Sequence, residues 1–307
     1  MDPIERITPK KDSSFAMLLE AKRRDADIHY FEQSDLKILD GTALGRSRQL
    51  SVSDRDNQWW QFGASGETQL GDLDVILMRK DPPFDMEYVY TTYILDRARE
   101  AGALIVNNPQ ALRDMNEKAY TAWFPDYAPS TLITRSMADL RAFLADEGHI
   151  VVKPLDGMGG KSIFVVRKGD NNANVIFETL TDFDSRFAMA QRYIPEISEG
   201  DKRILLIDGE PVPFALARIP APGENRGNLV VGATGKGQEL SDKDLEICER
   251  IGPVLRESGV IFAGIDVIGD FLTEVNVTSP TGMRELDRLF ELNIAGLMFD
   301  AIESKLS

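Results

Sequence analysis

The segment from Ile150 to Val166, with the sequence IVVKPLDGMGGKSIFVV, constrains the fold of this chain most strongly. Two apolar runs at its ends flank a glycine loop, which predicts a strand, a loop and a second strand. Backbone N–H groups in such a loop can approach a ligand closely because no Cβ intervenes, and Lys153 adds a positive charge. The segment predicts a phosphate-binding loop, with an ordinary glycine-turn hairpin as the alternative.

Two better-known phosphate loops do not fit these residues. A P-loop that ends at Gly160-Lys161-Ser162 requires glycine at the position of Leu155. A dinucleotide-binding G-x-G-x-x-G motif that begins at Gly157 requires glycine at the position of Ser162. Both motifs also lead into a helix, whereas residues 163–166 have the apolar pattern of a strand.

Charge and composition argue against several classes of protein. The 307 residues have a formal net charge of -15, with 50 acidic against 35 basic side chains, which disfavours a nucleic-acid or anionic membrane surface. One cysteine, Cys248, cannot form a disulfide framework or a cysteine zinc site within the chain. Two histidines, His29 and His149, offer little material for a histidine triad. We therefore expect a cytoplasmic protein with neither nucleic acid nor membrane as a partner.

The first third of the chain has the pattern of an α/β domain with a doubly wound parallel sheet. Residues 73–78 resemble a strand covered on both faces, residues 87–101 a helix, and residues 103–106 the next strand. Ligands of such βαβ units bind beyond the carboxyl ends of the strands, where Arg79 and Lys80 stand. A solvated charged turn is the alternative for these two residues.

The start of this domain departs from the usual order. Residues 13–24 predict a helix with a serine cap, and residues 26–31 predict a strand. A doubly wound domain normally opens with a buried strand, but the residues up to Pro9 are too polar and too proline-rich to form one. We expect the natural product to begin several residues upstream, with Met1 as an internal start. Residues 51–70 predict an irregular insertion.

The remainder of the chain alternates short strands with helices, as in an α+β protein. A glycine- and proline-rich stretch at 219–238 predicts a lid, because loops of this length in compact domains usually serve as lids or are disordered. The predicted strands are 132–134, 188–194, 204–207 and 212–217, and a second hairpin covers 262–277. The predicted helices are 136–146, 240–259 with Ser241 as cap, and 286–305.

Asp266, Glu274 and Asn276 are candidate metal ligands, since Mg²⁺ beside phosphates prefers carboxylate and carbonyl oxygens. Glu274 and Asn276 share one face of a strand. Asp266 joins them only if the hairpin connection has three residues or a bulge, because a clean two-residue turn pairs Asp266 with Thr273. We expect the bulged or three-residue form. The alternative is a half-exposed strand that alternates polar and apolar residues.

The order of these features along the chain resembles the ATP-grasp superfamily, and the match to the bacterial glutathione synthetase family is close. The residues that resemble this family lie in four segments. They are Met78-Arg79-Lys80-Asp81-Pro82-Pro83-Phe84, Asn116-Glu117-Lys118, Lys153-Pro154-Leu155-Asp156-Gly157-Met158-Gly159-Gly160 and Asn276-Val277-Thr278-Ser279-Pro280. The resemblance covers nearly the whole chain, apart from an opening strand that family members have.

This resemblance implies a domain order. Residues 1–117 would form an N-terminal substrate domain that lacks its first strand, and residues 118–307 an ATP-grasp module of two α+β subdomains. Within that module, residues 118–200 would clamp the nucleotide. Residues 201–307 would hold the metal and the catalytic groups, with the lid at 219–238.

The resemblance also implies the chemistry: ATP-dependent joining of γ-glutamylcysteine and glycine through an acyl phosphate, with Mg²⁺ or Mn²⁺ and by a homo-oligomer. Phosphoryl transfer requires mainly positioning and charge neutralisation. Arg203 and Arg218 would be catalytic. ATP would contact Lys118, Lys153, Gly157, Met158, Gly159, Gly160, Tyr193, Ile194 and Asp201. The peptide and glycine would contact Arg79, Lys80, Arg226, Asn228, Ser279, Pro280 and Thr281. The metal would bind Asp266, Glu274 and Asn276.

Two alternatives to this function remain at the level of sequence. One is another carboxylate-amine ligase of the same fold, which the Arg79-Lys80-Asp81-Pro82 segment disfavours. The other is a nucleotide-binding protein without turnover, which has less need of the two arginines at 203 and 218.

Overall fold

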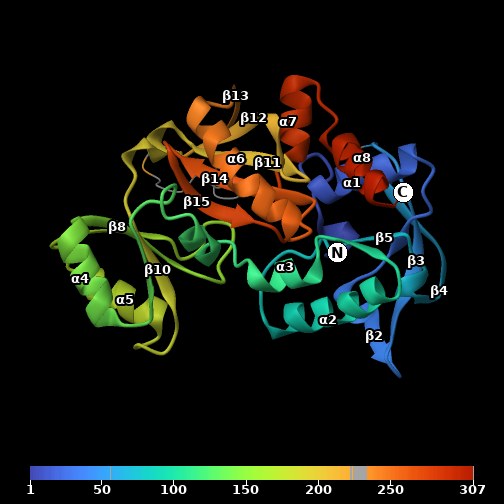
Figure 1. Cartoon of the computed structure of the whole chain (residues 1–307), viewed down its shortest axis with the longest axis horizontal. Coiled ribbons are helices and arrows are strands. Elements are labelled where there is room, and N and C mark those ends of the chain that lie inside the picture. The colour runs from blue at the N-terminus through green and yellow to red at the C-terminus, as the bar shows by residue number, and fades with distance from the viewer. Residues whose placement is uncertain (56, 222, 224–233, 307) are drawn as a thin grey trace.

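The computed structural model describes residues 1–55, 57–221, 223 and 234–306. Figure 1 shows a small lobe with α4 and α5 on the left, a central sheet with α6, and the N-terminal part on the right. The architecture is mixed α/β, as the sequence predicts. In the described part of the chain, no helix combines the length and the apolar character that a bilayer crossing requires.

The first helix is α1 (Ser13–Arg23), and its N-cap residue differs from the one predicted from the sequence. The cap is Asp12, whose carboxylate accepts a hydrogen bond from the Phe15 N–H at 2.8 Å, so the predicted serine cap is wrong. The two serines have other partners: Ser13 Oγ accepts from Met283 N, and Ser14 Oγ accepts from Arg79 Nε. Their hydroxyls therefore join α1 to the rest of the molecule.

An antiparallel sheet covers the outer side of the N-terminal part. Residues 51–70, expected as an irregular insertion, lie mostly in its strands, and that prediction is wrong. Val52 pairs with Trp60, and the aromatic rings of Trp60 and Phe62 pack at 4.8 Å. The polar residues between the aromatic ones hide the strand pattern in the sequence. The strands are β1 (His29–Tyr30), β2 (Leu36–Leu39), β3 (Thr42–Val52) and β4 (Trp60–Gln69), with the order β1-β3-β2 and β4 on β3.

The predicted βαβ unit is present. β5 (Val75–Leu77) and β6 (Leu104–Val106) pair in parallel, with α2 (Met86–Glu100) between them and α3 (Pro109–Asp114) after them. Among the described strands, β5 pairs with β6 alone. It also lines a cavity of about 560 Å³ together with residues of α1, β1 and α8. The expectation of an additional opening strand stays a prediction.

The small lobe has a sheet and a core of its own. Its antiparallel sheet has the order β7-β10-β8-β9, and its core contains Leu140, Ile150 and Phe177. The segment at 150–166 forms the predicted strand, loop and strand, with Val152 opposite Phe164. The elements are β7 (Thr131–Thr134), α4 (Met137–Glu147), β8 (His149–Pro154), β9 (Phe164–Arg167), α5 (Ala173–Thr181) and β10 (Ala188–Arg192).

The largest sheet is also antiparallel, with the order β13-β12-β11-β14-β15. Its strands are β11 (Asp201–Ile207), β12 (Glu210–Ile219), β13 (Thr234–Glu239), β14 (Phe262–Ile268) and β15 (Phe271–Asn276). Residues 234–238 of the predicted lid thus form a strand on β12, which is a correction. Pairing with β12 satisfies the backbone that an open loop would leave to water. Residues 222 and 224–233 of the lid lie outside the described residues.

The C-terminal part contains three helices where two were predicted. α6 (Asp242–Glu257) has the predicted cap at Ser241. The predicted helix at 286–305 is in fact two, α7 (Met283–Phe290) and α8 (Ile294–Leu306). Glu291 ends α7 in a left-handed conformation with φ of 53°, and the Asp287 carboxylate accepts the Ile294 N–H at 2.9 Å. No proline or glycine in the sequence marks this break.

The N-terminal part and the largest sheet share one apolar core. That core contains residues of α2 and β6 beside residues of β11, β14, β15 and α6. Buried Asn107 fastens the two parts: its side-chain nitrogen donates to the carbonyls of Phe262 and Val277 at 2.7 Å, and its oxygen accepts from Ile261 N and Phe262 N at 2.9 Å. The small lobe lies outside this core.

Candidate active site

The hairpin of β14 and β15 places two carboxylates side by side. Ile268 pairs with Phe271 across a two-residue turn, and the register then shifts so that Asp266 pairs with Glu274. Thr273 is the extra residue, and its hydroxyl donates to the Asp266 carbonyl at 3.1 Å. The expected bulged connection is confirmed, and the bulge puts both acids on one face of the sheet.

Two arginines on neighbouring strands hold Asp266. Arg203 on β11 binds both of its carboxylate oxygens, and Arg218 on β12 approaches Oδ2 at 2.9 Å. Burial alone would raise the pKa of Asp266, but the two guanidinium groups outweigh it and hold the pKa below its usual value. Asp266 is therefore a firmly ionised acid between two fixed cations.

Asp201 at the start of β11 pairs with the same Arg218. Its second oxygen, Oδ1, is buried and has no hydrogen-bond partner in the described part of the chain. Burial raises the pKa of this carboxyl to about 6, although Arg218 opposes the shift. Asp201 thus keeps one acceptor that a ligand could use.

Two buried lysines meet at Glu274: Lys118, at the start of the 3-10 helix Ala119–Trp123, and Lys153 on β8. Lys118 Nζ lies 3.5 Å and Lys153 Nζ lies 3.7 Å from Glu274 Oε1. Burial would raise the pKa of Glu274, but the two lysines hold it below its usual value. The pair Lys153–Glu274 therefore joins β8 of the small lobe to β15 of the largest sheet.

The glycine loop lies over this cluster. Lys118 Nζ donates to the Gly157 carbonyl at 2.6 Å, which fixes the start of the loop. A Cβ at Gly157 would lie 2.8 Å from Pro154 Cγ, and Gly159 and Gly160 have φ of +64° and +78°. These conformations suit glycine and let the backbone approach whatever lies in the cleft.

A cavity of about 230 Å³ lies beside these groups, and the side chains of Lys153, Asp201 and Asp266 are not part of its lining. This volume is below that of typical small-molecule pockets, so it suits part of a nucleotide rather than all of it. The predicted site residues that line it are Lys118, Gly157, Met158, Gly159, Gly160, Arg203, Arg218, Glu274, Asn276, Ser279, Pro280 and Thr281.

The acidic cluster fits a divalent cation that also binds phosphate. Within the described residues, no group of three or more histidine, cysteine, aspartate or glutamate side chains could hold a metal. Asp266 and Glu274 supply two carboxylates, and the amide nitrogen of Asn276 is buried without a hydrogen-bond partner. An amide not fixed through its nitrogen can turn its oxygen toward a ligand. Mg²⁺ in such sites is usually bound by one or two carboxylates, and phosphate oxygens of the substrate complete its coordination.

Other predicted site residues lie outside the cavity lining. Arg79 is buried and donates to Ser14 Oγ at 3.0 Å and to the Pro280 carbonyl at 3.1 Å. Lys80 pairs with Asp2 at 2.8 Å. Tyr193 and Ile194 follow the end of β10, with Tyr193 stacked on His149 at 3.9 Å. Arg226 and Asn228 lie outside the described residues.

Seven residues that line the cavity were not predicted as site residues: Asp81, Pro82, Glu117, Lys161, Ile163, Leu216 and Gly282. The Glu117 carboxylate accepts from Thr278 Oγ1 at 2.8 Å, and its backbone carbonyl accepts from Val275 N at 2.8 Å. It therefore joins the segment before Lys118 to β15. Lys161 lines the cavity as well. The sequence does contain a signal for Glu117, which directly precedes the lysine of its motif.

Comparison with known proteins identifies the family. The N-terminal domain model of prokaryotic glutathione synthetase matches residues 1–113, and the ATP-grasp domain model of the same family matches residues 117–291. The chain belongs to the prokaryotic glutathione synthetase family. It is 57% identical to the glutathione synthetase of Salmonella typhimurium over 307 residues, which cover 100% of this chain and 98% of that protein. It is 56% identical to that of Escherichia coli K12 over 306 residues, covering 100% and 97%.

Solved structures more distant from this family share the fold. The ATP-grasp ligase PsnB, complexed with a precursor peptide and AMPPNP, has a TM-score of 0.62 at 16% identity, covering 99% of this chain and 95% of that one. The D-cycloserine synthetase DcsG has a TM-score of 0.61 at 14% identity, covering 78% and 86%. These likenesses confirm the expected ATP-grasp architecture.

Proposed function

We propose that this chain joins γ-glutamylcysteine and glycine at the expense of ATP, giving glutathione, ADP and phosphate. The proposal rests on one observation above all: Lys153 of one antiparallel sheet lies 3.7 Å from Glu274 of the other, beside a cavity that Glu274 and the glycine loop line. Membership of the prokaryotic glutathione synthetase family supports the choice of substrates.

The first part of the reaction activates a carboxylate. A carboxylate is a poor electrophile at neutral pH, and transfer of the terminal phosphoryl group of ATP makes it an acyl phosphate with a good leaving group. Lys118 and Lys153 would bind the phosphates, exchanging their contact with Glu274 for contact with the nucleotide. Backbone N–H groups of the glycine loop would donate hydrogen bonds to the phosphates of ATP. Tyr193 and Ile194 would face the adenine, and Asp201 the nucleotide.

The second part of the reaction joins the amine. Arg203 and Arg218 would stabilise the charge on the transferred phosphoryl group and on the tetrahedral intermediate. Ser279, Pro280 and Thr281, which line the cavity, would receive glycine. Arg79 and Lys80 would face the peptide, joined by Arg226 and Asn228. We propose residues 1–117 as the substrate domain and 118–307 as the ATP-grasp module.

Asp266, Glu274 and Asn276 would hold Mg²⁺ or Mn²⁺, which when bound would screen the charge of the phosphates. A homo-oligomer in the cytoplasm is proposed as well. A reducing compartment suits a thiol-containing substrate and a chain with one cysteine, Cys248. Light scattering of the purified protein would give the oligomeric state.

Phosphate release with each substrate omitted in turn tests the function. We expect rapid release only when ATP, Mg²⁺, γ-glutamylcysteine and glycine are all present, with glutathione formed in equal amount. Replacement of γ-glutamylcysteine by D-alanine or glutamate tests for another carboxylate-amine ligase. Binding of ATP without turnover on any of these substrates would contradict the proposed function.

A further inference from the structure

Lys161 differs from the other cations of the cavity in its surroundings. Lys118, Arg203 and Arg218 each contact a carboxylate, of Glu274 or of Asp266. Lys161 lines the same cavity, yet within the described residues its side chain has neither an ion pair nor a hydrogen bond. Among the described cations that line the cavity, it is therefore the one that can bind an incoming anion without first giving up an ion pair.

Lys161 lies at the end of the glycine loop, where the loop lines the cavity. Lys161 is exposed and follows Gly159 and Gly160, and its N–H donates to the Met158 carbonyl at 3.3 Å. Ser162 after it has φ of +57°, so the loop turns sharply on both sides of this residue. Gly157, nearer the start of the loop, accepts a hydrogen bond from Lys118 Nζ.

The positions of the lysines and arginines indicate which phosphate of a nucleotide would lie near Lys161. Lys118 and Lys153 lie at Glu274, whereas Arg203 and Arg218 lie at Asp266. A nucleotide tail that extends from the two lysines toward the two arginines has its terminal phosphate at the arginine end. Lys161 lines this cavity together with both arginines.

We propose that Lys161 binds the terminal phosphate of ATP, as a binding and positioning residue of the glycine loop. This inference rests on the proposed use of ATP by the site. A triphosphate gains a charge-assisted hydrogen bond from Lys161 that a diphosphate lacks, so Lys161 distinguishes ATP from ADP. The loop would thereby favour entry of the co-substrate and release of the spent nucleotide.

The test compares Lys161→Met with Lys168→Met in the full chain. Methionine is unbranched like lysine and one atom shorter, and it removes the charge. Lys168 follows the same β8–β9 hairpin but donates to the Ala145 carbonyl, away from the cavity. Equilibrium binding of ATP and of ADP would be measured with Mg²⁺, together with the melting temperature of each variant.

We expect Lys161→Met to weaken ATP binding about tenfold or more, because a hydrogen bond to a charged group contributes roughly 1.5–3 kcal/mol. ADP binding should change less than about threefold, and Lys161→Arg should restore most of the ATP affinity. Lys168→Met should bind both nucleotides like the parent chain.

Equal weakening of ATP and ADP would overturn the assignment to the terminal phosphate. So would ATP affinity in Lys161→Met equal to that in Lys168→Met, or a change confined to the KM for γ-glutamylcysteine. The proposed function is tested separately, by glutathione formation in the parent chain. A parent chain that selects ATP through Lys161 but forms no glutathione would contradict the function and leave this inference in place.

Discussion

Arg218 binds two carboxylates at once, so its role depends on the shape of its side chain as well as on its charge. Its guanidinium contacts Asp201 and Asp266 on two different strands. Lysine keeps the charge but has no planar fork to reach both partners. We expect Arg218→Lys to lower kcat by about two to three orders of magnitude, as removal of one transition-state donor typically does. The melting temperature should change little, since a cation remains beside both acids.

Arg256→Lys is the matched control for this variant. Arg256 pairs with Glu210 at the surface and does not line the cavity. Steady-state rates at saturating substrates decide the outcome: a kcat for Arg218→Lys within about threefold of that for Arg256→Lys would exclude a catalytic role for the guanidinium.

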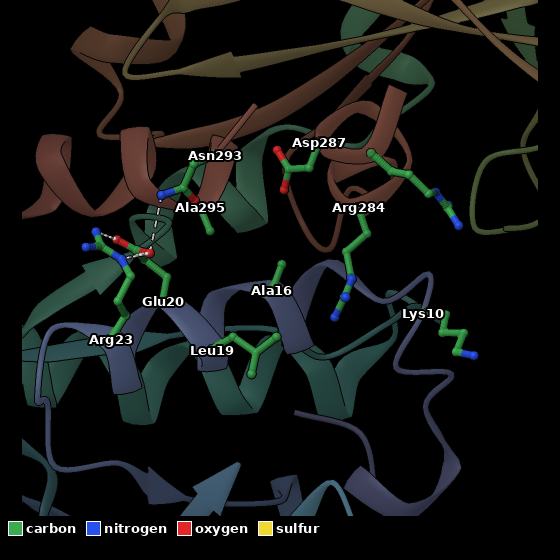
Figure 2. Close-up of a pocket in the computed structure, with 10 residues that line it drawn as sticks. Lys10, Ala16, Leu19, Glu20, Arg23, Arg284, Asp287, Asn293 and Ala295 are labelled. Carbon is green, nitrogen blue, oxygen red and sulfur yellow. Dashed lines mark hydrogen bonds and ion pairs between the residues drawn. The ribbon is translucent and has the colours of Figure 1, made fainter. Parts of the chain in front are cut away.

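Glu20 provides a pH-dependent contribution to stability. Figure 2 shows it between Arg23 and Asn293, in a surface pocket that α1 forms with residues of α7 and α8. The hydrogen bonds from Arg23 lower the pKa of this carboxyl to about 2, against burial and with help from Arg24 and Asn293. The folded state therefore favours the ionised form, and the stabilisation is present above the unfolded pKa, near 4.5, and lost as the pH falls toward 2.

Glu20→Gln tests this contribution. We expect it to lower the free energy of unfolding by about 2 kcal/mol at pH 7, because hydrogen bonds to a charged group are lost. The difference from the parent chain should shrink as the pH falls from 4.5 toward 2. Urea unfolding at pH 7 and at pH 3 measures both values, and a difference that stays constant between them would refute the role of ionisation.

At the scale of the elements, α6 packs against the turn between β11 and β12 through two glycines. A Cβ at Gly252 would lie 2.1 Å from the Gly209 carbonyl oxygen. Alanine favours a helix by about 1 kcal/mol over glycine, but the contact is with backbone, which cannot move aside easily. We expect Gly252→Ala to destabilise the fold by about 1–2 kcal/mol in net, as measured by chemical denaturation.

Glu249→Ala on the exposed side of α6 serves as the comparison, with an expected change within about 0.5 kcal/mol. If Gly252→Ala were more stable than the parent chain, helix propensity would outweigh packing, and the close contact of α6 with the turn would not limit this position.

Most elements of this fold are visible in the sequence, and the exceptions have physical causes. Ser241 before an amphipathic run correctly predicts the start of α6. The break between α7 and α8 is hidden, because Glu291 adopts a left-handed conformation that its residue type does not favour. The bulge at Thr273 could be predicted only from the requirement that Asp266 and Glu274 meet.

The candidate site also has a part that the sequence predicts and a part that it does not predict. Lysines, arginines and glycines of known motifs can be named from the sequence, because their chemistry requires those residue types. The partners of these residues cannot, since they depend on which strands become neighbours. The burial of Arg79 against Pro280 and the contact of Glu117 with Thr278 join segments far apart in the chain, and no local pattern indicates either contact.

At the scale of the whole molecule, the three parts are unequally connected. The N-terminal part and the largest sheet share a core and the hydrogen bonds of Asn107, whereas the small lobe has a core of its own. The lobe contacts the largest sheet through Lys153, which approaches Glu274 and donates to the Thr273 carbonyl at 3.3 Å. A part with a separate core can open without unfolding the rest.

Hydrogen exchange with and without nucleotide should reveal this division. In the free protein, we expect amides of β8 and β10 to exchange at a lower opening free energy than those of β11 and β14. ATP with Mg²⁺ should slow exchange in β8 and in the glycine loop, because the ligand would bridge Lys153 and the acids of β14 and β15. Protection in α2 and β6 should change little, since they belong to the shared core. Equal opening energies throughout, unchanged by nucleotide, would mean that the small lobe unfolds together with the rest of the molecule.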